Sequence, residues 1–314
     1  MSFSSEIKKE LAGVSVSKEE HKRAELAGII YLNSTLTISM GGASLNINTE
    51  SMDVVKRTIS MIKALYGLEP ELLLKDAQLK KTATYIVRLN GGGTVITLLS
   101  DLGLTFGNGL EVDKERFKDI IFSSGCREAF LRGAFLGAGS ISDPKKEKHL
   151  EIVAARENIA DILEGLMSFM GLNVKKTLRK LYHVVYLKQT ESIISFLTIT
   201  GAHRGVLELE SIQVYKEIKN NLNRQVNFEQ ANQDRTINSA QESILNINKI
   251  IRTVGLEGLP KNLRDTAALR IEYPEATLAE LAELAGNTTK SGINHRLRRL
   301  NEIALAISDK GGKI

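Results

Sequence analysis

Apolar residues recur at helical spacing in two stretches that stand in the same relation to their surroundings. The first is residues 26–34, and the second is residues 131–140, which read Leu-Arg-Gly-Ala-Phe-Leu-Gly-Ala-Gly-Ser. Each has a glycine at its third position, Gly28 or Gly133. Glycine inside a helix costs roughly 1 kcal/mol relative to alanine, so a helix that keeps it usually needs a close backbone approach. We therefore expect the two helices to pack on each other with their small residues inward.

The segments that follow each stretch also correspond, at landmarks about 98 to 105 residues apart. This period is too long for a solenoid. Apolar spacing predicts the following pairs: strands 45–49 and 150–153, helices 51–65 and 158–170, strands 85–89 and 183–187, and helices 95–103 and 193–201. The pattern predicts an α+β domain at residues 1–215. It would contain two copies of a helix, strand pair, helix, strand pair, helix unit, at about 17–104 and 124–202.

Two short polar motifs predict where helices begin. Ser17-Lys-Glu-Glu20 and Thr277-Leu-Ala-Glu280 both have the spacing of a capping box. In such a box the first and fourth residues exchange hydrogen bonds between side chain and backbone. We expect the first box to start the first repeat helix and the second to start a helix near the C-terminal end.

The composition changes after the repeats. Residues 206–220 have the apolar spacing of an amphipathic helix, whereas residues 220–234 are rich in Asn and Gln and have few apolar side chains to bury. A stretch of this kind suits a domain boundary. We therefore expect a polar linker at 216–236 and an all-α domain at 237–314.

The all-α region has the pattern of a helix-turn-helix. The predicted helices are 237–254, 261–271, one with an apolar stripe that starts after Thr277, and about 290–307. Gly286-Asn287 separates the last two. Two helices around a glycine-containing turn, with another helix ahead of them, are typical of this motif.

The last of these helices carries the sharpest functional pattern. Ile293, Leu297 and Leu300 recur at a spacing of three and four residues and should face the core. Within this helix, no acidic residue comes before Glu302. In a major groove arginine can bond guanine and asparagine can bond adenine, while lysine and serine can hold phosphates. The predicted DNA-binding residues are Thr289, Lys290, Ser291, Asn294, His295, Arg296, Arg298 and Arg299. The alternative is a charged, solvated helix of a structural bundle.

The composition narrows the class of protein. The 314 residues are 42% hydrophobic and 25% charged, as in soluble globular proteins, and the net charge of +5 favours a polyanionic partner. No segment reaches the roughly 20 apolar residues of a membrane span, so we expect a cytoplasmic protein with no membrane partner. The single Cys126 excludes an internal disulfide framework and a zinc site made of cysteines. We expect Cys126 to pack in the core, and we predict no metal and no other cofactor.

The two glycine-containing helices resemble the LAGLIDADG motifs of homing endonucleases, with Leu26-Ala27-Gly28 as the closest literal match. In such nucleases, acids at the helix ends hold the metal ions that assist phosphodiester cleavage. The corresponding positions here are Asn33 and Ala138, and neither carries a charge. The resemblance therefore implies a DNA-shaped platform without catalytic residues. It also implies secondary DNA contacts in the loop after the second motif, at Lys145, Lys146 and Lys148.

Two degenerate LAGLIDADG copies followed by a helix-turn-helix resemble the WhiA family over nearly the whole chain. Residues 291–300 are similar to that family's recognition helix, and Arg224, Asn227 and Asn232 are similar to its inter-domain segment. The resemblance implies a non-enzymatic, nucleoid-associated transcription regulator of sporulation, cell division or chromosome segregation. It implies double-stranded promoter DNA as a partner, the promoter of its own gene included. A sigma factor or RNA polymerase is the implied protein partner.

Two other functions are compatible with the sequence. A metal-dependent DNA endonuclease would need acids from elsewhere, and Glu25 and Asp143 are the nearest. Glu25 lies about 12 Å along the helix from Asn33, at about 1.5 Å per residue, so it would not replace the missing ligand without rearrangement. A protein-docking adaptor would instead use the first domain to recruit a sigma factor or polymerase to DNA. Residues 1–215 would then hold a protein and bind DNA negligibly.

Overall fold

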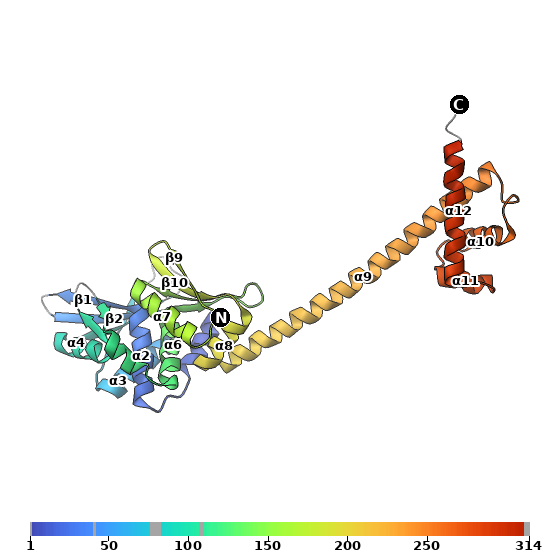
Figure 1. Cartoon of the computed structure of the whole chain (residues 1–314). Coiled ribbons are helices and arrows are strands. Elements are labelled where there is room, and N and C mark those ends of the chain that lie inside the picture. Colours follow the sequence, from blue (N-terminus) through green and yellow to red (C-terminus); the bar gives the residue numbers. More distant parts are fainter. Residues whose placement is uncertain (1, 40–41, 76–82, 107–109, 311–314) are drawn as a thin grey trace. The chain divides into compact units, whose positions relative to one another are not determined.

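The computed structural model describes residues 2–39, 42–75, 83–106 and 110–310. The chain divides into two compact units, Met1–Tyr215 and Lys216–Ile314. The first unit combines helices with antiparallel sheets, and the second is helical (Figure 1). The α+β class expected from the sequence is confirmed.

The first unit begins with α1 (Phe3–Ala12) and then repeats one succession of elements. The first copy consists of α2 (Glu19–Asn33), β1 (Ser34–Ser39), β2 (Gly42–Thr49), α3 (Met52–Tyr66), β3 (Glu71–Lys75), β4 (Thr84–Asn90) and α4 (Gly92–Asp101). The second consists of α6 (Ser124–Ala138), β7 (Gly139–Ile141), β8 (Leu150–Ala154), α7 (Glu157–Phe169), β9 (Lys175–Arg179), β10 (Tyr182–Leu187) and α8 (Thr190–Thr200). The predicted order of helices and strand pairs is therefore confirmed in both copies.

Each copy forms a four-stranded antiparallel sheet with the same strand order. The order is β1-β2-β4-β3 in the first sheet and β7-β8-β10-β9 in the second. In the first sheet Leu45 lies opposite Leu36 on one side and Leu89 on the other. Alternate residues of β2 are buried against the helices, which leaves the polar Ser44 and Asn46 on the opposite face.

Helices α2 and α6 pack against each other in the middle of the first unit (Figure 1). A Cβ atom placed on Gly28 would lie 2.2 Å from the carbonyl oxygen of Phe130, and one on Gly133 would lie 1.9 Å from that of Glu25. Because these distances are far below van der Waals contact, the approach of the two backbones requires glycine at both positions. The predicted packing through small residues is confirmed.

A segment between the two copies was not expected from the sequence. It contains β5 (Leu104–Phe106), β6 (Leu110–Val112) and α5 (Lys114–Ile120). Phe117 packs edge-on against Phe130 of α6, with 5.2 Å between ring centroids. Strands of three residues are too short for an alternating pattern to distinguish them from a loop.

The stretch predicted as a polar linker, 216–236, is part of a helix, since α9 runs without interruption over His203–Thr253. No glycine or proline lies between Gly205 and Gly255, so nothing in this stretch breaks the backbone hydrogen bonds of a helix. Gln225 also donates to the Glu229 carboxylate one turn later, at 3.1 Å. The amide-rich composition limits what the helix can bury without preventing it from forming.

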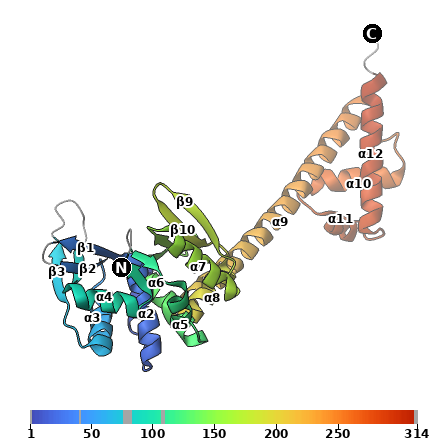
Figure 2. The ribbon, with the colours of Figure 1, turned by 60° about the vertical axis from the view of Figure 1, so that its left-hand side comes forward.

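The second unit contains α9 from Lys216 onward together with α10 (Lys261–Glu272), α11 (Leu278–Ala285) and α12 (Lys290–Lys310) (Figure 2). These are the predicted helices of the helix-turn-helix region. Their shared core is apolar and is formed mainly by Ile247, Ile250, Leu263, Ala267, Leu281, Ile293, Leu297, Leu300 and Ala304. None of the described helices is both long enough and apolar enough to cross a bilayer.

The two predicted capping boxes have different outcomes. Thr277 and Glu280 form the expected box at the start of α11. At the start of α2, however, Lys18 occupies the N-cap position and its side chain makes no capping bond. The prediction for Ser17 is wrong because the helix begins one residue later than a box led by Ser17 requires.

Candidate nucleic-acid interface

Helices α11 and α12 form a pair joined by a short turn. The turn starts at Gly286, whose φ of +70° lies in the left-handed region that favours glycine. Ile293, Leu297 and Leu300 of α12 are buried in the core of the second unit. Because these residues recur every three or four positions, the opposite face of α12 is left to solvent.

The predicted DNA-binding residues occupy three positions around α12. The side chains of Ser291, His295 and Arg298 are exposed opposite the buried stripe. Lys290 and Asn294 are also exposed, and this pair lines, together with Arg298, the side of α12 that faces α9. Arg296 is half-buried and lies on the opposite edge of the helix from this pair. The structure therefore brings most of the predicted residues together and sets Arg296 apart.

Two of the predicted residues already have partners within the helix. The Thr289 hydroxyl accepts a hydrogen bond from the backbone N–H of Gly292 at 3.3 Å, which is an N-capping contact. Arg299 forms an ion pair with Glu302 at 2.8 Å. The hydrogen bond from Arg299 lowers the pKa of the Glu302 carboxyl. Both groups are therefore charged, and the negative charge of Glu302 offsets the positive charge of Arg299.

Lys290, Asn294 and Arg298 also line a groove of about 540 Å³ between α9 and α12. Two arginines that the sequence analysis missed, Arg235 of α9 and Arg270 of α10, line the same groove. Arg235 lies in the stretch that was expected to be a linker. Arg270 is only 2% exposed and falls at a buried position of α10. An arginine on the apolar stripe of a helix is the signal that could have identified it.

The C-terminal ends of α2 and α6 hold the two positions at which nucleases of the LAGLIDADG type carry acids. The Asn33 side-chain amide donates to the carbonyl oxygen of Gly137 at 3.0 Å and also to that of Asn48. Ala138 offers no side-chain ligand atom. A single neutral amide oxygen does not fit a magnesium site, which is built around carboxylates. Asn33 instead fastens one helix end to the other.

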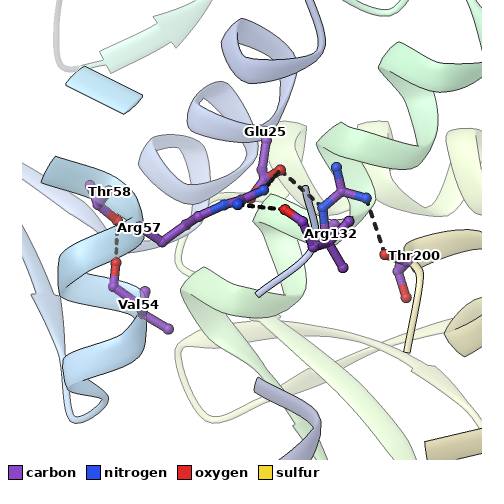
Figure 3. A network of polar contacts seen from close by, with 7 residues as sticks. Glu25, Val54, Arg57, Thr58, Arg132 and Thr200 are labelled. Atoms are coloured by element: carbon purple, nitrogen blue, oxygen red, sulfur yellow. Dashed lines mark hydrogen bonds and ion pairs between the residues drawn. The ribbon is translucent and has the colours of Figure 1, made fainter. Parts of the chain in front are cut away.

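Both of the alternative acids have hydrogen-bond partners within the protein. Glu25 is fully buried and is bonded to Arg57 of α3 at 2.8 Å and to Arg132 of α6 at 2.9 Å (Figure 3). Asp143 lies on an exposed loop, where its carboxylate accepts a hydrogen bond from the backbone N–H of Lys145 at 2.9 Å. Glu25 thus forms ion pairs inside the core, and Asp143 stabilises a surface turn.

The three lysines predicted as secondary contacts lie in the loop between β7 and β8. Lys145 and Lys146 are exposed. Lys148 is half-buried, and its ammonium group donates to the Thr190 hydroxyl at 2.7 Å. Only the first two therefore stand free at the tip of this loop.

One group of side chains in the described ranges could share a metal ion, although the sequence predicted none. Ligand atoms of Glu20, His21 and Cys126 lie within 4.8 Å of one another at the N-terminal ends of α2 and α6. Cys126 itself is buried, as expected. Glu20 is thirteen residues before Asn33 in α2, roughly 20 Å at about 1.5 Å per residue. The group is therefore distant from the C-terminal ends of α2 and α6, where Asn33 and Ala138 lie.

Three family models match the chain, one after another. Residues 19–105 match the WhiA N-terminal LAGLIDADG-like domain, residues 127–219 the WhiA LAGLIDADG-like domain, and residues 222–304 the WhiA C-terminal HTH domain. The probable cell division protein WhiA of Alkaliphilus metalliredigens is 39% identical over 310 residues, which cover 97% of this chain and 98% of that protein. Its counterpart in Latilactobacillus sakei is 40% identical over 313 residues, with 98% and 99% covered.

Solved structures agree with these sequence matches. The crystal structure of full-length DUF199/WhiA from Thermatoga maritima has a TM-score of 0.60 and 27% identity, and it covers 98% of this chain and 99% of that chain. The N-terminal LAGLIDADG domain of DUF199/WhiA has a TM-score of 0.50 at 20% identity, which shows the shared fold. Three domain models matched in order, together with relatives near 40% identity along their full length, show that this chain belongs to the WhiA family.

Proposed function

We propose that this chain is a sequence-specific regulator of transcription that binds double-stranded DNA through α12. The observation that carries the proposal is the exposed face of α12, where Ser291, Asn294, His295 and Arg298 lie together with no acid before Glu302. Asparagine and arginine present hydrogen-bonding groups that match adenine and guanine in the major groove. Lys290 and Arg296 flank this face and would hold phosphates. Membership of a family with a C-terminal HTH domain supports this assignment.

The processes that such a regulator would control follow from its relatives. Those from Alkaliphilus metalliredigens and Latilactobacillus sakei are named as probable cell division proteins, and this supports a role in cell division here. The family resemblance extends the proposal to chromosome segregation and sporulation, with promoters, its own included, as targets at the nucleoid.

We further infer that the first unit has no nuclease activity. The positions that would need acids are Asn33 and Ala138, and the carboxylate of Glu25 is held by two arginines. Metal-assisted cleavage needs concentrated negative charge to hold its ions, and these helix ends lack it. The first unit would then act as a surface that contributes contacts to DNA from Lys145 and Lys146, and from Lys148 once its ammonium group leaves the Thr190 hydroxyl.

A second role for the first unit, docking of a protein such as a sigma factor or RNA polymerase, is favoured by its sheet edges. Leu74 on β3 and Leu178 on β9 are 60% and 62% exposed. They occupy equivalent positions in the edge strands of the two sheets. Exposed apolar residues on edge strands are typical of surfaces that pair with another chain.

A gel-shift experiment tests these proposals together. The full chain and a version ending at Tyr215 would be titrated onto duplex from upstream of its own gene and onto random duplex, with and without magnesium. We expect the full chain to prefer the specific duplex, the shortened chain to retard neither, and the DNA to stay intact. Cleaved DNA in magnesium would overturn the absence of nuclease activity. Unchanged retardation by the shortened chain would overturn the role of α12.

A further inference from the structure

The groove between α9 and α12 is strongly cationic. The groove has a volume of about 540 Å³. Four basic side chains line it, Arg235, Arg270, Lys290 and Arg298, and none of the described residues that line it is acidic. Its remaining polar lining is hydroxyl and amide, from Thr236, Ser239, Ser243, Thr277, Asn294 and Asn301. Two acids of α11 and α12 have hydrogen-bond partners of their own, Glu280 with Thr277 and Glu302 with Arg299. Four cations therefore gather here with no acid in the lining, although Arg298 also lies near Glu302, whose pKa its charge helps to lower.

Arg270 is the unusual member of this set, because it is buried without a carboxylate partner in the described structure. Its side chain is 2% exposed, and its Nη1 donates to the carbonyl oxygens of Ala276 at 2.6 Å and Pro274 at 3.4 Å. Its Nε is buried and has no hydrogen-bond partner among the described residues. Burial lowers the pKa of Arg270, yet a guanidinium stays charged in proteins. A buried charge that only carbonyl dipoles compensate is costly, and an anion would relieve that cost.

The other three cations stand at the mouth of the groove. Arg235 comes from α9, whereas Lys290 and Arg298 lie two turns apart on one side of α12, and all three are exposed. Arginine presents a planar fork that matches phosphoryl oxygens in pairs, and lysine adds a compact point charge. Lys290 is also the first residue of α12, where backbone N–H groups favour an anion.

We propose that this groove binds a small phosphate-bearing ligand of the pyrophosphate or nucleotide class, held between Arg235, Lys290 and Arg298 above Arg270. A groove of this volume falls in the range of small-molecule sites. A duplex backbone is convex and could reach the mouth, but it would leave Arg270 uncompensated. Bound ligand would cancel the charge of Lys290 and Arg298. If α12 binds DNA as proposed above, the bound ligand would therefore weaken DNA binding, and this consequence rests on that proposed function.

Calorimetric titration of the full chain with inorganic pyrophosphate, and separately with ADP, tests the site in the absence of DNA. We expect saturable binding with one ligand per chain, weakened about tenfold by Arg235→Ala because one of the phosphoryl contacts is removed. Arg252→Ala is the matched control, since Arg252 is an exposed arginine of the same helix outside the groove. Arg235 is itself exposed, so its replacement should leave the fold intact.

The outcomes separate this proposal from the proposed function. No saturable binding of either ligand at millimolar concentrations would overturn it, as would equal affinities of the Arg235→Ala and Arg252→Ala proteins. Loss of DNA affinity in Arg235→Ala without any ligand binding would assign the groove to backbone phosphates of DNA, and the small-ligand proposal would be wrong. Because the titrations contain no DNA, a failure of α12 to read bases would leave their result unaffected.

Discussion

Arg132 of α6 donates a hydrogen bond from its Nε to the carboxylate of Glu25 on α2 across 2.9 Å, although 107 positions separate them in the sequence (Figure 3). Arg57 of α3 donates to the same carboxylate at 2.8 Å. Arg132 also donates to the carbonyl oxygen of Thr200, at the end of α8. A fully buried carboxylate thus joins elements of both repeats, and two guanidinium groups compensate its charge.

Glu25→Gln should lower the free energy of unfolding of the first unit by about 3 to 5 kcal/mol, because it leaves two guanidinium groups in the core without a counter-charge. Urea unfolding followed by circular dichroism measures the change. Glu19→Gln, at an exposed position in the first turn of the same helix, is the control and should stay within about 0.5 kcal/mol of the parent. Equal stabilities of the two variants would show that the charge of Glu25 contributes nothing.

Gly133→Ala should destabilise the first unit by about 3 kcal/mol, because the new Cβ would meet the carbonyl oxygen of Glu25 at 1.9 Å and force α2 and α6 apart. Gly165 of α7 is the matched control, since no atom lies within 4 Å of a Cβ built there. Gly165→Ala should instead raise stability by up to about 1 kcal/mol through helix propensity. Thermal unfolding of the two proteins should shift in opposite directions, and a shift in the same direction would contradict the close helix contact.

The repeat could be predicted from the sequence because each of its helices and strands has its own local pattern of apolar residues. Apolar spacing and the glycines at 28 and 133 identify two helices with small faces that can pack on each other. The order of helices and strands follows from the same spacing. The short β5, β6 and α5 segment carries too few periods to be identified, and the continuity of α9 depends on the absence of helix breakers more than on composition.

The candidate site was predictable only in part, for a physical reason. The exposed face of α12 follows from the spacing of Ile293 and Leu297, because a buried stripe fixes the opposite face of its own helix. The groove depends on Arg235 and Arg270, which reach it from two other helices. No local pattern relates residues on three helices, and the ion pair between Glu25 and Arg132 was missed for the same reason.

Asp101 should make the first unit sensitive to acid. Its carboxylate accepts hydrogen bonds from Arg23 at 2.8 Å, Tyr66 at 2.8 Å and Arg116 at 2.7 Å. Burial alone would raise the pKa of Asp101, but the Tyr66 hydrogen bond and the two arginines outweigh it and lower the pKa below its ordinary value. A lowered folded-state pKa gives stability that is present above the unfolded-state pKa, near 4, and is lost as the pH falls through the folded-state pKa.

Asp101→Asn should therefore be less stable than the parent at neutral pH and should lose less stability between about pH 5 and pH 3. Unfolding by urea at several pH values gives both quantities. Asp119→Asn is the control, because Asp119 is 73% exposed and lies 4.0 Å from Arg116. Parallel pH profiles for the parent and Asp101→Asn would exclude Asp101 as the source of the acid sensitivity.

Arg298 and Lys290 should differ in what their loss does to DNA binding. If Arg298 reads a guanine, Arg298→Ala should cost about 1 to 3 kcal/mol on the specific duplex and less on random DNA, because the phosphate contacts are unchanged. Lys290→Ala should weaken both duplexes alike and reduce the salt dependence by about one phosphate contact. Arg299→Ala should cost less than Arg298→Ala, since Arg299 must first leave Glu302. Anisotropy titrations at several salt concentrations measure these differences, with Arg252→Ala as the charge control. Equal losses on both duplexes for Arg298→Ala would mean that α12 holds the backbone and reads no base there.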